Sequence, residues 1–301
     1  MACSTKFFPA EKTLREINFS YTIPHPRWRA NKIFINLLPN LIIMKEGFDV
    51  RIVSYEHIHS INPKDEEAMI KAINPKPKEK ILDAFCGYGA VGKNILAKES
   101  KADLWFNDES EVQIKRAKEN LPNIPTEKFI AGNFLKVDFG KNYFDKIVMK
   151  MGLHEVSKKL QIDVTKKVSQ ILKPNGKFIV WDIMLNNDTQ TLFQDVIRKK
   201  DELAGFDMLT RERYFFREDE FLETMKKANF SKIKDFHTIT YRFSSRKRLE
   251  SELHNDKKLL DKLNAFIRNR FPEELKEPLK FEDLGDDIQF NIIKKIYVMT
   301  K

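Results

Sequence analysis

Cysteine and long apolar segments are both scarce in this chain of 301 residues. Cys3 and Cys86 are the only two cysteines, so no disulfide framework is predicted. The longest apolar stretch, residues 33–44, contains two asparagines and a proline, and it is shorter than the roughly 20 residues needed to cross a bilayer. The N-terminus has no apolar signal-peptide core. We therefore expect a cytoplasmic protein with no membrane insertion.

Glycine and proline are also few, at 10 and 12 residues, which excludes collagen-like and low-complexity chains. Apolar residues make up 42% of the sequence and include 24 phenylalanines, enough for a substantial core and too many for a wholly disordered chain. The length fits one domain of about 200 residues with about 100 residues of additions.

The balance of charge is basic, with 54 lysines and arginines against 44 acids and a net charge of +10. Such a balance favours polyanionic partners. The excess is spread along the chain, however, and its densest run, Arg-Lys-Arg at 246–248, is short and precedes an acidic stretch. This distribution favours a lysine-rich solvated surface over a nucleic-acid binding surface.

Short apolar strands alternate with amphipathic helices after residue 75. Strands are predicted near 80–85, 104–106, 128–130, 146–149 and 178–181, and a helix at 218–228 precedes strands at 233–243 and 288–300. This alternation predicts an α/β fold with a doubly wound, mostly parallel sheet. Residues 1–75 are expected to form an N-terminal extension and residues 76–301 the core, with a helical insertion at about 245–285.

A glycine-rich segment, Gly-Tyr-Gly-Ala-Val-Gly at 87–92, stands between the first strand and a helix. Glycines there permit a tight turn and close approach of the backbone to a ligand, and a dinucleotide is the first interpretation. Asp83 opposes it, because a carboxylate would repel a pyrophosphate and attract a cationic ligand such as S-adenosylmethionine. Asp108 and Glu109 follow the second strand, where ribose hydroxyls need an acceptor.

The segment Asp-Ala-Phe-Cys-Gly-Tyr-Gly at 83–89 resembles the first motif of class I S-adenosylmethionine-dependent methyltransferases. Segments at 107–110, 131–134 and 172–176 resemble the family's later motifs, in the same order. The resemblance implies a Rossmann-like sheet of seven strands, with the last strand, 288–300, antiparallel. It also implies a cofactor over the carboxyl ends of the first strands.

Nine residues are implied by this resemblance as cofactor contacts: Asp83, Cys86, Gly87, Gly89, Asp108, Glu109, Asn133, Phe134 and Lys150. Asn133 stands where aspartate is commoner in the family, and it keeps a side-chain oxygen for the adenine amine. Phe134 is equally well explained as a core aromatic. Cys86 is better explained as a small residue packed under the loop than as a nucleophile.

The segment Met-Lys-Met-Gly-Leu-His-Glu-Val at 149–156 bears on the methyl acceptor. It lacks the Asn-Pro-Pro-Tyr or Asp-Pro-Pro-Trp of the methylases that act on exocyclic base amines. No cysteine follows Cys86, as the m5U-type RNA methylases would require. The segment instead resembles the Leu-His-Glu of the small-molecule branch, which includes the ubiquinone and menaquinone biosynthesis enzymes. Transfer of a methyl group to a small-molecule acceptor, by in-line displacement, is therefore the predicted function.

His154 is the candidate general base, since its unperturbed pKa near 6.5 suits neutral pH. The alternative is that His154 braces the fourth strand. Trp28, Tyr55 and His57 are candidate acceptor contacts in the N-terminal extension, which is expected to cover the site as a lid. A scaffold or a dimer interface is the alternative for that extension, and no metal site is expected.

Two other functions stay open from the sequence. An RNA methyltransferase is supported by the net charge of +10. A non-catalytic adaptor with the methyltransferase fold is opposed by the complete set of Asp83, Gly87, Gly89 and Asp108. The sequence does not identify the acceptor, the methylated atom or the oligomeric state.

Overall fold

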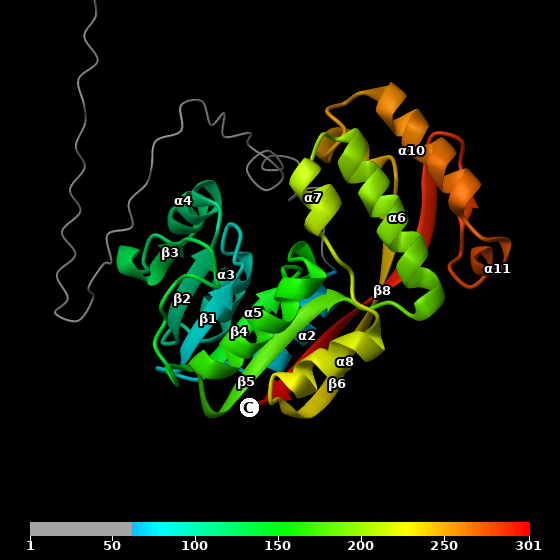
Figure 1. The fold of residues 1–301 in the computed structure, drawn as a ribbon. Coiled ribbons are helices and arrows are strands. Elements are labelled where there is room, and N and C mark those ends of the chain that lie inside the picture. The colour runs from blue at the N-terminus through cyan, green and yellow to red at the C-terminus, as the bar shows by residue number, and fades with distance from the viewer. Residues whose placement is uncertain (1–61) are drawn as a thin grey trace, which may run out of the picture. The chain divides into compact units, whose positions relative to one another are not determined.

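The computed structural model describes residues 62–301, and a twisted sheet organises them (Figure 1). Its strand order is β3-β2-β1-β4-β5-β8-β6, with a short β7 paired to β8. β1 to β5 pair in parallel, whereas β8 runs antiparallel to both β5 and β6. The strands are β1 (Lys80–Ala84), β2 (Asp103–Asp108), β3 (Phe129–Ala131), β4 (Phe144–Lys150), β5 (Leu172–Ile183), β6 (Ser231–Ser244), β7 (Glu282–Asp283) and β8 (Ile288–Thr300). The predicted fold class, with its reversed last strand, is confirmed.

Helices cover both faces of the sheet. One face packs against α2 (Pro63–Ile73), α3 (Ala90–Lys98) and α4 (Glu111–Asn120). The other packs against α5 (Lys158–Ile171) and α8 (Glu218–Lys227). Among the described helices, none has the length and apolar composition needed to cross a bilayer.

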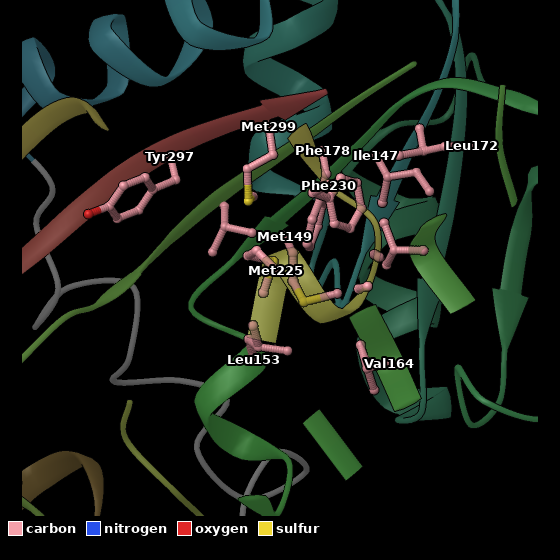
Figure 2. Close-up of a cluster of buried hydrophobic side chains, with 14 of the residues drawn as sticks. Ile147, Met149, Leu153, Val164, Leu172, Phe178, Met225, Phe230, Tyr297 and Met299 are labelled. Carbon is pink, nitrogen blue, oxygen red and sulfur yellow. The ribbon is translucent and has the colours of Figure 1, made fainter. Parts of the chain in front are cut away.

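Residues of β4 and β5 alternate between these two faces. Met149 and Phe178 point into the core beneath α5 and α8, whereas Val148 and Ile179 point into the core beneath α2 and α3. Figure 2 shows the first of these cores, where side chains from β4, β5, β8, α5 and α8 meet. Strands buried on both faces read as continuous apolar runs, which is why their positions could be predicted from the sequence.

A third apolar core lies where β8 and β6 extend past the end of β5. The pairing of β5 with β8 stops at Ile183↔Lys294, and from Ile293 toward Ile288 the main partner of β8 is β6. This part of the sheet packs against α6 and α10, which lie side by side in Figure 1. The helices of this region are α6 (Asn187–Leu203), α7 (Asp207–Glu212), α9 (Lys247–Ser251), α10 (Lys257–Arg270) and α11 (Glu273–Lys276).

Helix α6 is absent from the sequence-based expectations, although it has 17 residues. A capping box between Asn186 and Thr189 begins it, and its buried residues include Leu192, Phe193 and Val196. The signal was therefore present in the sequence as a start motif followed by apolar residues at helical spacing.

Gly92 allows α3 to lie directly on β2. A Cβ atom at this position would stand 2.3 Å from Cε1 of Phe106. The Phe106 ring is itself fixed by stacking on Phe129, with ring centroids 4.7 Å apart. The first turn of α3 can approach the sheet this closely only because residue 92 lacks a side chain.

We expect Gly92→Ala to destabilise the fold by about 2 kcal/mol, because the added methyl overlaps a ring that cannot move freely. Urea unfolding measures the change, with Lys93→Ala, an exposed neighbour in the same helix, as the control. Combining Gly92→Ala with Phe106→Leu should recover part of the loss, since the smaller side chain leaves room. Equal stability of Gly92→Ala and the wild type would contradict this account.

Candidate functional site

The turn between β1 and α3 is built from residues with left-handed backbone angles. Phe85, Gly87 and Gly89 have φ values of 57°, 52° and 82°. A Cβ atom at Gly87 would meet nothing within 4 Å, so this stretch of backbone borders open space. Such an angle is uncommon for a bulky residue like Phe85, and backbone strain of this kind is often found at functional sites.

Phe85 also fixes the next loop of the site. A Cβ atom at Gly152, which follows β4, would stand 2.7 Å from the Cβ of Phe85. The two loops are therefore in direct contact, and only glycine fits at position 152.

Asp83 lies near the end of β1 and is buried, with 2% of its surface exposed. Its Oδ2 accepts a hydrogen bond from the Gly92 N–H at 3.2 Å. Burial raises the pKa of Asp83 to about 8, despite the opposing effects of that hydrogen bond and of the charge of Lys150. A buried carboxyl group with a raised pKa beside a glycine loop is a candidate functional group, and a cationic ligand beside it would lower that pKa and favour the carboxylate.

Asp108, at the end of β2, holds the glycine loop. Its Oδ2 accepts a hydrogen bond from the Gly87 N–H at 2.8 Å, and its Oδ1 accepts one from the Ser110 N–H at 2.9 Å. The next residue, Glu109, accepts a hydrogen bond at its Oε1 from the Nδ2 of Asn133, at 3.2 Å. The structure thus brings together Asp108, Glu109 and Asn133 with the loop at the carboxyl edge of β1, β2 and β3.

Cys86 and Phe134 have the surroundings of core residues. Cys86 is buried, and burial raises the pKa of its thiol well above the usual range, so the thiol stays protonated. The Phe134 ring packs between Phe85 and Phe139, with centroid distances of 5.6 and 5.5 Å. These contacts favour the packing interpretation for both residues.

Lys150 ends β4, two residues after Val148, which pairs with Asp83. Its Nζ lies 4.9 Å from the centre of the Trp181 ring. Lys150 lines a small cavity with Glu66 of α2, Asn94 of α3 and Trp181. Burial lowers the pKa of Lys150.

Trp28, Tyr55 and His57 lie outside the described residues. Their predicted contacts with the acceptor, and the predicted lid at 1–75, stay predictions. The part of that extension that the structure describes is α2, which packs against β5, β6 and β8.

His154 is buried and both of its ring nitrogens face carboxylates. Nδ1 is 2.5 Å from Asp182 Oδ1, and Nε2 is 3.4 Å from Glu155 Oε1. Burial lowers the pKa of His154, but the two carboxylates outweigh it and raise the pKa to about 9. An imidazole that is already protonated cannot accept a proton at neutral pH. The geometry therefore opposes the general-base interpretation and favours the bracing role.

Asp182 has no place in the sequence-based expectations, yet it organises the loop after β4. Its Oδ2 accepts hydrogen bonds from the backbone N–H groups of Leu153 and His154, at 3.1 and 3.3 Å. The available signal was a single acid at the end of an apolar strand, Phe-Ile-Val-Trp-Asp-Ile at 178–183. Within residues 62–301, no group of three or more histidine, cysteine or acidic side chains could hold a metal ion.

We expect His154→Gln to destabilise the protein in a pH-dependent way. The pKa of His154 rises on folding from 6.5 to about 9, so its contribution is complete below pH 6.5 and is lost as the pH rises through 9. The pH-dependent part of the difference in unfolding free energy should be on the order of 3 kcal/mol at pH 6 and vanish near pH 10. Denaturant unfolding across this range measures it, and Asp182→Asn should reduce the same pH dependence. A difference that is equal at all pH values would mean that the ring is neutral.

The profile of a family described as a methyltransferase domain matches residues 81–176. The chain is 28% identical over 194 residues to 24-methylenesterol C-methyltransferase 3 of Arabidopsis thaliana, which covers 58% of this chain and 50% of the relative. It is 30% identical over 193 residues to sterol 24-C-methyltransferase ERG6B of Gibberella zeae, covering 62% and 45%. The chain thus spans about half the length of these curated relatives.

Solved structures share the fold. The YcgJ protein from Bacillus subtilis superposes with a TM-score of 0.65 at 15% identity, covering 80% of this chain and 99% of that chain. Phosphoethanolamine N-methyltransferase 2 of Haemonchus contortus, solved with S-adenosyl-L-methionine, gives a TM-score of 0.52 at 15% identity, covering 84% and 57%. Together with the matched profile, these similarities agree with the resemblance noted in the motifs: residues 81–176 match a methyltransferase domain, and the chain shares its fold with a solved methyltransferase.

Proposed function

We propose that this protein transfers a methyl group from S-adenosylmethionine to a small-molecule acceptor by in-line displacement. The observation that carries the proposal is the hydrogen bond of Asp108 to Gly87 beside the buried Asp83. Two carboxyl groups, those of Asp83 and Asp108, thus lie against the glycine loop at one edge of the sheet. The matched methyltransferase domain covers the same residues.

The residues present fit this cofactor. Asp83 would attract the ammonium and sulfonium groups of its methionine end, and Gly87 leaves room for close approach of the backbone. Asp108 and Glu109 would accept hydrogen bonds from the ribose hydroxyls. The side-chain oxygen of Asn133 would accept a hydrogen bond from the adenine amino group. When bound, the cofactor supplies a methyl group activated by the sulfonium. The chain's own contribution is to position the acceptor and exclude water.

The relatives support a small acceptor. The curated relatives are named as sterol C-methyltransferases, whereas the Haemonchus enzyme is named as an N-methyltransferase of phosphoethanolamine. The methylated atom is therefore left open between carbon, nitrogen and oxygen. Trp28, Tyr55 and His57 keep their proposed place as acceptor contacts, while His154 is no longer proposed as the base.

Calorimetric titration with S-adenosylhomocysteine, with NAD as the control ligand, tests the cofactor. We expect micromolar binding of the first and none of the second. Asp108→Asn should weaken the binding at least tenfold, because a charged acceptor for the ribose is lost. Asp163→Asn, an exposed acid on α5, makes the same charge change and should have no effect. Binding of NAD in place of S-adenosylhomocysteine would refute the proposal.

Asp83→Asn should weaken binding of S-adenosylmethionine and, at the same time, stabilise the free protein at high pH. The carboxyl pKa of 3.8 rises to about 8 on folding, so the wild type loses stability between these values as the pH rises. The expected slope is about 1.4 kcal/mol for each pH unit, and the asparagine variant should lack it. Thermal unfolding of both proteins from pH 4 to pH 9 measures this. Parallel stability curves, or unchanged cofactor affinity, would contradict the placement of the site.

A further inference from the structure

Two lysines project from the same face of the sheet, next to the proposed cofactor site. Lys150 of β4 pairs with Trp181 of β5, and Trp181 pairs with Ile296 of β8. Lys294 lies two residues before Ile296, so its side chain points to the same face. Asp83 shares this face too, because it pairs with Val148, which lies two residues before Lys150 in β4 and points to the same side.

Each lysine rests on an aromatic ring. Lys150 Nζ lies 4.9 Å from the ring centre of Trp181, and Lys294 Nζ lies 3.7 Å from that of Tyr241. The Tyr241 hydroxyl in turn accepts a hydrogen bond from Arg248 at 2.5 Å. Three cationic side chains therefore gather on this side of β4, β8 and α9.

The two carboxylates whose charge acts on Lys294, Asp182 and Asp65, each contact a histidine. Asp182 holds His154 at 2.5 Å, and Asp65 holds His237 at 2.9 Å. Within residues 62–301, neither Lys150 nor Lys294 has a carboxylate within 4.0 Å. Lys295, which points to the opposite face, differs in that it contacts both Glu218 and Asp235.

The surroundings of Lys294 disfavour an isolated positive charge. Burial, together with the charges of Arg248 and Lys150, lowers the pKa of Lys294 to about 7. The indole N–H of Trp181 is also buried, and among residues 62–301 it has no hydrogen-bond acceptor. Glu66, which lines the same small cavity, and Asp83 act on Lys150 by their charge. An anion would satisfy both lysines and the indole N–H.

We propose that Lys150 and Lys294 bind an anionic group of the methyl acceptor, a carboxylate or a phosphate. This inference rests on the proposed function and specifies its substrate class. The other source of such a group is the carboxylate of the cofactor itself. Lys294 favours the acceptor, because β8 lies three strand spacings, about 14 Å, from β1 and Asp83. The acceptor would then lie over β5 and β8, with its anionic group held away from the reacting atom.

The experiment uses inorganic phosphate as the probe, titrated at constant ionic strength into the protein saturated with S-adenosylhomocysteine. We expect millimolar binding by the wild type and at least tenfold weaker binding by Lys294→Gln. Lys234→Gln makes the same charge change on the exposed surface of β6 and should bind phosphate like the wild type. Lys294→Arg, which keeps the charge, should retain most of the affinity.

A second measurement separates the anionic group of the acceptor from the carboxylate of the cofactor. It compares, in the wild type and in Lys294→Gln, the affinities for S-adenosylhomocysteine and for 5′-methylthioadenosine, which lacks the carboxylate. If Lys294→Gln weakens only the former, the lysines bind the cofactor and the inference is wrong. It is also wrong if the wild type does not bind phosphate, or if Lys234→Gln loses as much affinity as Lys294→Gln. Absence of S-adenosylhomocysteine binding in the wild type would instead refute the proposed function, and phosphate would then be titrated into the free protein. Should Lys294→Gln unfold, Lys294→Met and Lys150→Gln provide the same comparison.

Discussion

A buried ionic network joins the end of the sheet to the third apolar core, and the arrangement of the site depends on it. Asp182 binds His154, Glu155 binds Arg213 at 2.6 Å, and Arg213 binds Asp201 at 2.8 Å. The network continues through Lys200 and Glu252 to Arg248. Four acids thus face four bases. Such a network is costly to bury and contributes little net stability, but loss of one member leaves a buried charge unpaired.

The network has a consequence for the neighbouring lysines. Asp182 and Glu155 flank the His154 ring, so the charge of Asp182 that acts on Lys294 is shared with the imidazole. On the side of Trp181, burial and the charges of Arg248 and Lys150 disfavour the charged form of Lys294. The same carboxylate therefore positions the loop after β4 and acts on the lysine that we propose as part of an anion site.

The sequence predicted the fold well where burial and backbone angles decide it. The strands β1, β4 and β5 each contain a short apolar run, at 81–82, 147–149 and 178–181, and the turn at 87–92 needs glycine. The environment of His154 could not be predicted, because its partner Asp182 lies 28 residues away and is brought close only by the pairing of β4 with β5. The surroundings of Lys294 could not be predicted either, because they depend on the contacts of Asp182 with His154 and of Asp65 with His237. Local patterns specify elements, but the protonation of a side chain depends on tertiary neighbours.

The contact between Phe85 and Gly152 links the two halves of the site mechanically. The Cβ and ring atoms of Phe85 occupy the space where a side chain at residue 152 would begin, so the β1 loop and the β4 loop pack directly against each other. Any side chain at residue 152 would push the two loops apart, so this one position sets how closely the glycine loop and the segment after β4 can approach each other.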